Sequence, residues 1–166
     1  RIINEQQAKM VIQGLKYNPL DKTYPDNEIF VSNENIPLQA YKAERHIWDY
    51  VVTDSDNERK FVEELDGADE VVVYAKLPDR FQIPTPFGSY NPDWAIAFNK
   101  DKVRQIYFVA ETKGSMLDSD LREKEKRKIE SAEKFFATLN QENQSLGDAV
   151  QYSVIDSFGS LMNLVK

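Results

Sequence analysis

Residues 93–113, DWAIAFNKDKVRQIYFVAETK, decide the fold of this chain. They hold two short apolar runs separated by a polar segment at 99–104. Short runs that alternate, or that are rich in β-branched and aromatic residues, are typical of strands. The stretch therefore predicts a strand at 93–98, a turn, and a strand at 105–112. As an antiparallel hairpin, these strands would bring the start of the first beside the end of the second.

Charged residues occur where those two strand ends would meet. Residues two apart on a strand share a face, so Glu111 and Lys113 are expected to project side by side. Asp93 is expected to face Glu111 across the hairpin. Opposed carboxylates repel one another, and a divalent cation relieves that repulsion. The hairpin thus predicts a cation site at its charged end.

This arrangement suits the hydrolysis of a phosphodiester. Asp93 and Glu111 supply hard oxygen ligands for Mg²⁺, with Mn²⁺ as a substitute, and the backbone carbonyl of Thr112 adds another oxygen. A bound metal polarises the phosphate and lowers the pKa of a water ligand. Lys113 would orient that water or neutralise charge that develops in the transition state. Asp93, Glu111 and Lys113 are therefore the predicted catalytic residues.

The segments around the hairpin predict an α/β fold. Ser55 and Glu58 form a capping-box pattern that opens a helix to about residue 65. The other expected elements are a strand at 70–76, a loop or irregular hairpin arm at 79–92, a helix from 118 or 120 to 139, and a strand at 149–155 followed by a short amphipathic tail. The order is helix, three strands, helix, strand. It predicts a mixed central sheet flanked by helices.

The first fifty residues are less regular. An amphipathic helix is expected at 4–16, and loops with one strand near 28–31 are expected at 18–37, which is rich in Pro, Asn and Asp. Residues 38–52 fit a helix or a strand equally well. We interpret residues 1–50 as an N-terminal extension or linker that packs on a core domain formed by 51–166.

The composition excludes several kinds of site. The chain has no cysteine and a single histidine, His46, so disulfides, zinc ribbons, thiol nucleophiles and histidine-rich metal sites are excluded. No apolar run approaches the roughly 20 residues needed to span a bilayer, so no membrane association is expected. We expect a cytoplasmic protein. Because the chain does not begin with Met, we also expect it to be a fragment of a longer protein.

The charge is unevenly distributed. The net charge is −7, which argues against strong nonspecific binding of nucleic acid. Residues 100–134 nevertheless hold ten Lys or Arg and eight Asp or Glu. The segment next to the predicted site is therefore the most basic part of the chain, and it favours a weak grip on phosphate.

The pattern of Pro92-Asp93, a spacer and Glu111-Thr112-Lys113 resembles the PD-(D/E)xK nuclease superfamily. More specifically, FQIPTPFGSYNPDWAIAF and YFVAETKGS resemble the endonuclease domain of the restriction subunit of type III restriction-modification enzymes. The segments DYVVTDSDNERKFVEELD and EKEKRKIESAEKFF extend this similarity to residues 50–139. The resemblance implies a core of helix, three strands, helix and strand, and a prokaryotic Mg²⁺-dependent nuclease domain, here 51–166, that cleaves double-stranded DNA.

The resemblance also implies partners outside this chain. The restriction subunit of this family carries a helicase-like motor that is driven by ATP, and a methyltransferase (modification) subunit reads the DNA sequence. None of the six glycines begins a G-K-S or G-K-T triplet, so the phosphate loop of such a motor is absent. ATP is therefore expected to act only in the full-length enzyme.

Further residues have both functional and structural interpretations. In several PD-(D/E)xK nucleases an acidic residue of the first helix completes the metal site, which makes Glu58 a possible ligand here; a helix-capping role is the alternative. Glu125 and Lys128 are candidates for supporting Lys113 or for contacting a phosphate, and a solvated charge lattice is the alternative. His46 is expected to be structural.

Two other functions fit the sequence. The chain could be a catalytically silent module that docks a motor onto a methyltransferase. It could also be a DNA-repair or junction-resolving nuclease of the same superfamily. Retention of Asp93, Glu111 and Lys113 argues against the first, and the acidic net charge argues against the second.

Overall fold

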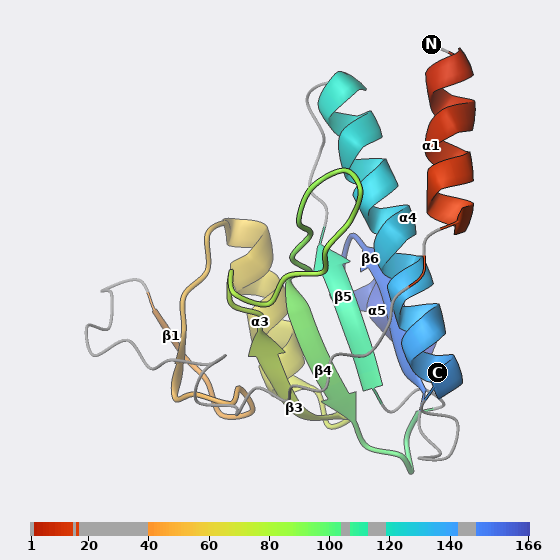
Figure 1. Ribbon diagram of the computed structural model, residues 1–166. Helices are drawn as coiled ribbons and strands as arrows, with labels where there is room; N and C mark the ends of the chain where they lie inside the picture. The colour runs from red at the N-terminus through yellow and green to blue at the C-terminus, as the bar shows by residue number, and fades with distance from the viewer. Residues whose placement is uncertain (1, 15, 17–39, 104–106, 113–118, 143–148) are drawn as a thin grey trace.

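A four-stranded mixed sheet forms the centre of the molecule. The computed structural model describes residues 2–14, 16, 40–103, 107–112, 119–142 and 149–166. The strands lie in the order β3 (Val71–Lys76), β4 (Trp94–Phe98), β5 (Tyr107–Thr112) and β6 (Val150–Ile155). Strand β4 is antiparallel to both β3 and β5, and β5 and β6 are parallel. The mixed sheet expected from the order of elements is confirmed (Figure 1).

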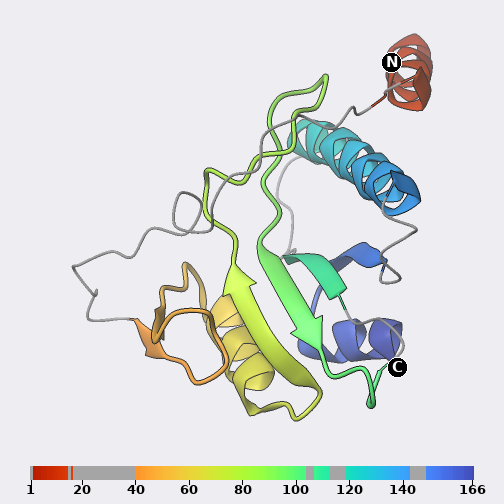
Figure 2. The ribbon, with the colours of Figure 1, turned by 60° about the horizontal axis from the view of Figure 1, so that its bottom comes forward.

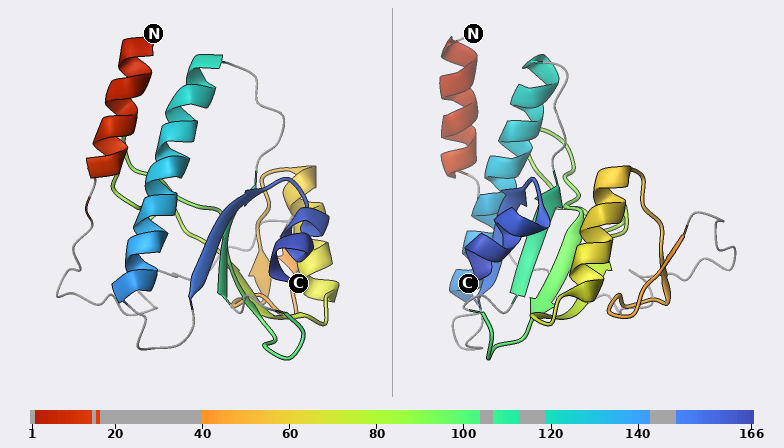
Figure 3. Two further views of the ribbon diagram at one scale, coloured as in Figure 1. Left: turned by 90° about the vertical axis from the view of Figure 1, so that its right-hand side faces the viewer. Right: turned by 180° about the vertical axis from the view of Figure 1, so that it is seen from behind.

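Helices cover the two faces of this sheet. One face packs against α3 (Asp56–Gly67) and α5 (Phe158–Val165), and the other carries α4 (Ser119–Glu142). The helix α1 (Ile2–Gly14) lies on the outer side of α4. The layers of the molecule are therefore α1, α4, the sheet, and the pair of α3 and α5 (Figure 3). Lys134 of α4 connects this helix to α1, since its Nζ donates to the carbonyl oxygen of Ile12 at 2.8 Å.

Alternation along β4 separates the two faces of the sheet. Trp94, Ile96 and Phe98 are buried towards α3 and α5, with exposed fractions of 3% or less. Ala95 and Ala97 occupy the intervening positions and are half-buried. This period of two is the pattern that predicted a strand, and it gives the two faces side chains of very different size.

Each helix meets the sheet through an apolar stripe. In α3 the stripe consists of Phe61, Val62 and Leu65, each with an exposed fraction of 4% or less. Ser55 caps this helix, because its Oγ accepts from the backbone N–H of Glu58 at 3.2 Å. In α4 the expected stripe is confirmed: Ile129, Ala132, Phe136 and Leu139 all join the core between that helix and the sheet.

Residues 40–52 cover the free edge of β3. The short strands β1 (Tyr41–Lys42) and β2 (Tyr50–Val51) pair with each other. Between them, the backbone N–H of Tyr74 donates to the carbonyl of Arg45, and the N–H of Ile47 donates to the carbonyl of Tyr74, both at 3.0 Å. The segment therefore adds a parallel rung to the sheet edge. Of the two structures that the sequence left open, residues 40–52 take short strands, joined by bends, and no helix.

The remaining differences from the expected boundaries are small. The first helix begins at Ile2 and ends at Gly14 rather than spanning 4–16, and β4 starts at Trp94 rather than at residue 93. Residues 79–92 form the irregular arm, held by an isolated antiparallel bridge between Ile83 and Tyr90. The strand expected near 28–31 lies outside the described residues. No described helix has the length and apolar character needed to cross a membrane.

Candidate functional site

The pairing of β4 with β5 aligns the two predicted acidic positions. Trp94 pairs with Ala110 and Ala95 with Val109 in an antiparallel register. Continuing this register by one rung sets Asp93 opposite Glu111. The backbone around Asp93 still follows the sheet, because its carbonyl oxygen accepts from the N–H of Leu77 on the β3 side at 2.8 Å. The expected hairpin is confirmed.

The register also assigns these positions to one face of the sheet. Trp94 is completely buried towards α3, where its ring lies 5.6 Å from that of Phe61. By alternation, position 93 falls on the other face with Ala95, and this is the face that carries α4. Positions directly opposite each other on an antiparallel pair share a face, so position 111 belongs to the α4 face as well.

The segment before Asp93 fixes its place at the sheet end. Pro92 is fully buried. Asn91 Nδ2 donates to the carbonyl oxygens of Pro78 at 3.1 Å and Phe81 at 2.7 Å. The amide of Asn91 thus joins the start and the end of the 79–92 segment next to Asp93. Asn91 therefore braces the turn that leads into Asp93.

The other members of the predicted site lie at the same end of β5. Thr112 is the last residue of the strand, and its backbone pairs with Ile155 of β6. The backbone of Glu111 pairs with Val154. Lys113 lies outside the described residues. Within the described part of the chain, no three His, Cys, Asp or Glu side chains group closely enough to hold a metal ion.

Glu58 engages a cation rather than a second carboxylate. Its Oε2 accepts from Lys76 Nζ at 3.0 Å and from the backbone N–H of Asp54 at 2.9 Å. The capping box expected from Ser55 and Glu58 is therefore only half formed. Ser55 caps the helix as expected, but the Glu58 carboxylate accepts from the backbone N–H of residue 54 rather than from that of Ser55. Lys76 pairs with Trp94 in the sheet and so lies on the α3 face. Glu58 thus has its present partners across the sheet from position 93.

Lys76 is a residue that the sequence reasoning did not single out. Its ammonium also meets Asp54 Oδ2 at 2.5 Å and lies 6.0 Å from the centre of the Trp94 ring. Burial alone would lower the pKa of Lys76, but the hydrogen bonds and charges of Asp54 and Glu58 outweigh burial and raise it. The residue is therefore a fixed positive charge. The sequence offered one indication of this role, since Lys76 is a charged residue at the end of an otherwise apolar strand.

Glu125 and Lys128 form an ion pair on α4. The Lys128 Nζ lies 3.8 Å from Glu125 Oε1, and the two side chains are only 18% and 27% exposed. Lys128 also approaches the 79–92 arm, since its Cε lies 3.7 Å from where a Cβ on Gly88 would stand. The pair is therefore held between helix and arm, which differs from a lattice of fully solvated charges.

His46 has the structural role expected of it. Its Nε2 accepts from the backbone N–H of Lys76 at 3.1 Å, and its Nδ1 lies 3.1 Å from the carbonyl oxygen of Trp48. A neutral ring protonated on Nδ1 satisfies both contacts. Burial lowers the pKa of His46, which keeps the ring neutral. The histidine joins residues 40–52 to β3.

The donor chemistry of the aligned positions fits a hard divalent cation. Asp93 and Glu111 offer carboxylate oxygens, and Thr112 offers a backbone carbonyl at the same strand end. Oxygen ligands of this kind are those that Mg²⁺ takes in proteins. The chain has no cysteine, and its single histidine, His46, already bonds to the backbones of Lys76 and Trp48, so the ligands that zinc and copper prefer are not offered here.

Comparison with known proteins gives the chain its family. A family model described as "Endonuclease domain" matches residues 44–158. The Res subunit of the type III restriction-modification enzyme EcoP15I from Escherichia coli is 32% identical over 127 residues, which are 75% of this chain and 12% of that protein. The EcoPI Res subunit from Escherichia phage P1 is 31% identical over 126 residues, or 74% of this chain and 12% of that protein.

These relatives set the scale of the similarity. The chain spans about an eighth of the length of either Res subunit, so it corresponds to one part of those proteins. No solved structure matches the chain. The matched range begins in the edge segment at residue 44 and ends at the start of α5, so it contains the whole central sheet. The chain belongs to the endonuclease-domain family, and its relatives are Res subunits of type III restriction-modification enzymes.

Proposed function

We propose that this chain is the Mg²⁺-dependent DNA endonuclease domain of a type III restriction enzyme, with a PD-(D/E)xK core. One observation carries the proposal: the β4–β5 register sets Asp93 opposite Glu111 at the sheet end, beside Thr112. The order α3, β3, β4, β5, α4, β6 supports the same core, because it repeats the helix, three strands, helix and strand of that superfamily.

We assign a role to each residue of the site. Asp93 and Glu111 would hold Mg²⁺ through their carboxylates, and the Thr112 carbonyl would add a third oxygen. The bound ion supplies a Lewis acid for the phosphate and lowers the pKa of a water ligand. Lys113 would orient the attacking water or neutralise charge that develops on the phosphate. Glu58 would join this set only by exchanging Lys76 for the metal.

The proposal assigns the rest of the activity to other parts of a longer protein. The chain has no phosphate loop, so we assign ATP hydrolysis to a helicase-like motor outside these residues. A methyltransferase subunit would read the DNA sequence. The isolated chain should therefore be a weak nuclease, because it is acidic and has no motor to deliver its substrate.

Substitution of the site residues in the full-length enzyme tests the proposal. Asp93→Ala and Lys113→Ala should each abolish cleavage of duplex DNA in Mg²⁺ while ATP hydrolysis persists. Lys102→Ala is a matched control, because Lys102 is an exposed cation in the turn at the opposite end of the sheet. Undiminished cleavage by both site variants would refute the assignment.

Two outcomes would favour the other functions. Calorimetry that detects no divalent-metal binding by this chain at millimolar concentration would favour a silent docking module. Cleavage of branched DNA without ATP or a partner subunit would favour a repair nuclease.

A further inference from the structure

The 79–92 arm leans on α4 at the end of the sheet where Asp93 lies. Its outer part, residues 83–90, is closed by two backbone hydrogen bonds between Ile83 and Tyr90 of 2.7 and 2.9 Å. The arm re-enters the sheet through Pro92 and Asp93. Figure 2 shows this loop, in green, reaching along the amino-terminal half of α4.

Internal contacts hold the tip of the arm in one conformation. Thr85 Oγ1 donates to the carbonyl oxygen of Gly88 at 2.5 Å and accepts from the N–H of Phe87 at 3.2 Å. Gly88 has a φ of 109°, which other residues rarely adopt. At the base, the Tyr90 hydroxyl lies 2.6 Å from that of Tyr152 in the core. The arm is therefore a preorganised element anchored to β6.

Two consecutive cations of α4 lie against this arm. The guanidinium carbon of Arg127 is 5.6 Å from the centre of the Phe87 ring. The Cε of Lys128 stands 3.7 Å from the Cβ position of Gly88, where no side chain intervenes. Their side chains are 26% and 18% exposed. Both positive charges are thus gathered at the exposed tip of the arm.

The acidic neighbours do not saturate these cations. Arg127 lies 3.8 Å from Glu123 and Lys128 lies 3.8 Å from Glu125. An N–H···O hydrogen bond spans roughly 2.7–3.2 Å, so both ion pairs are looser than direct hydrogen bonds. Arg has five N–H donors in a fork that matches phosphate, and Lys has three. The two side chains can therefore turn donors towards an anion at the arm.

We propose that Arg127, Lys128 and the tip of the arm form a phosphate-binding notch that positions one backbone strand of duplex DNA beside Asp93. The inference rests on the proposed function, because its ligand is the DNA that the site would cleave. It adds the residues that hold the strand. In a chain of net charge −7, two cations gathered against one arm give that surface a local attraction for phosphate.

The salt dependence of DNA binding tests the notch directly. Binding of this chain to a short fluorescent duplex is measured by anisotropy across a salt series, with Ca²⁺ in place of Mg²⁺ to prevent cleavage. The slope of log K against log salt changes by about 0.9 for each phosphate that the protein neutralises. The double variant Arg127→Ala/Lys128→Ala should therefore reduce the slope by roughly 1.8.

A matched double variant separates the notch from a general effect of charge. Lys60→Ala/Lys102→Ala removes two exposed cations from α3 and from the far turn, and its slope should equal that of the parent chain. Equal slopes for the parent and Arg127→Ala/Lys128→Ala would overturn the notch, as would an equal reduction in the control. Absence of salt-dependent binding by the parent would also overturn it.

A second variant separates phosphate binding from support of the arm. Phe87→Leu removes the ring beneath the guanidinium and leaves both charges, so it should keep the parent slope; Arg127→Lys should keep it too. A slope in Phe87→Leu as low as that of the double alanine variant would mean that the cations act by holding the arm. Cleavage by Asp93→Ala and the salt slope of Arg127→Ala/Lys128→Ala are separate measurements, so failure of the nuclease assignment and failure of the notch give different results.

Discussion

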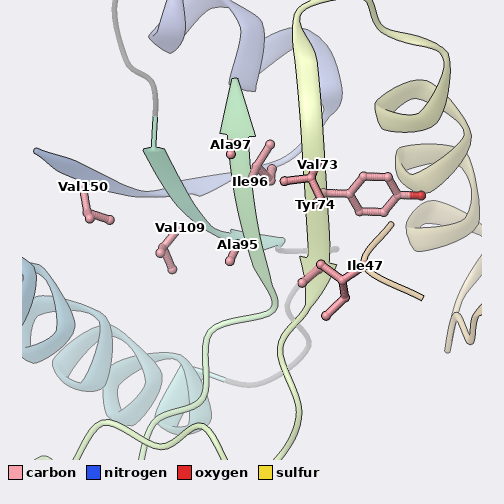
Figure 4. Close-up of a pocket in the computed structure, with 9 residues that line it drawn as sticks. Ile47, Val73, Tyr74, Ala95, Ile96, Ala97, Val109 and Val150 are labelled. Atoms are coloured by element: carbon pink, nitrogen blue, oxygen red, sulfur yellow. The ribbon is translucent and has the colours of Figure 1, made fainter. Parts of the chain in front are cut away.

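The two faces of the central sheet differ in how they are filled. The face towards α3 and α5 holds large side chains, and Trp94 and Tyr74 are no more than 1% exposed there. The face towards α4 holds Ala95 and Ala97 on the same strand, and a recess of about 290 Å³ opens over it (Figure 4). Asp93 and Trp94 are neighbours in the sequence, yet Trp94 fills the core towards α3, while position 93 falls on the face that carries α4.

This difference indicates how stability and chemistry are divided. A completely buried aromatic residue contributes several kcal/mol, and its truncation leaves a cavity. The half-buried carboxylate of Asp93 fills no such space, so an amide of the same shape should be tolerated at this position. Substitutions at adjacent positions should therefore separate the two contributions cleanly.

Trp94→Ala should give the largest loss of stability. The ring is fully buried between Phe61 and Tyr74, so the free energy of unfolding should fall by about 3–5 kcal/mol. Asp93→Asn, one residue away, should change it by less than about 0.5 kcal/mol. Denaturant titration followed by tryptophan fluorescence of Asp93→Asn, and by circular dichroism of both variants, measures the two effects. Equal losses at 93 and 94 would mean that Asp93 is part of the structural core.

Lys76→Gln should have an intermediate effect, confined to stability. The substitution removes ion pairs to Asp54 and Glu58 that are partly shielded from solvent, at a cost of about 1–2 kcal/mol. Because Lys76 and position 93 lie on opposite faces, the Kd for Mn²⁺ measured by calorimetry should stay at the parent value. A tenfold tighter Kd would contradict this separation and would show that the released Glu58 enters the metal site.

A change of pH should give the smallest effect, through His46. Its folded pKa is lowered, so between that value and the unfolded pKa of about 6.5 the unfolded chain binds more protons. The contribution of His46 to stability is therefore complete above about pH 6.5 and is lost as the pH falls through the folded pKa. The Tm should fall from about pH 7.5 to about pH 5.5, and His46→Gln should flatten this dependence. An unchanged slope in the variant would exclude His46 as its source.

Local periodicity predicted the parts of the fold whose partners are close in sequence. The alternation of residues 94–98 and the apolar run before Glu111 predicted the hairpin, and the register then aligned Asp93 with Glu111. The stripe of α4 was predicted in the same way. Both patterns reflect burial of one side of a regular element, which leaves a repeat in the sequence itself.

Pairings between distant segments left no such repeat. Residues 40–52 show neither the helical nor the strand period, and their structure depends on the pairing of β1 with β2 and on one rung to Tyr74 of β3. Glu58 matched a capping box, yet Lys76, eighteen positions later, takes its carboxylate. Arg127 meets Phe87 only because of the path of the 79–92 arm, which no local repeat predicts. In each case a tertiary partner determined the role.

A crystal structure of this chain grown with Mn²⁺ would show whether Asp93 and Glu111 hold a metal ion together. We expect an anomalous peak bound by carboxylate oxygens of both residues, at distances of roughly 2.0–2.3 Å typical of such ligands. We also expect that peak to be lost in Asp93→Asn. A metal bound elsewhere, or two carboxylates pointing to opposite sides of the sheet, would contradict the proposed metal site.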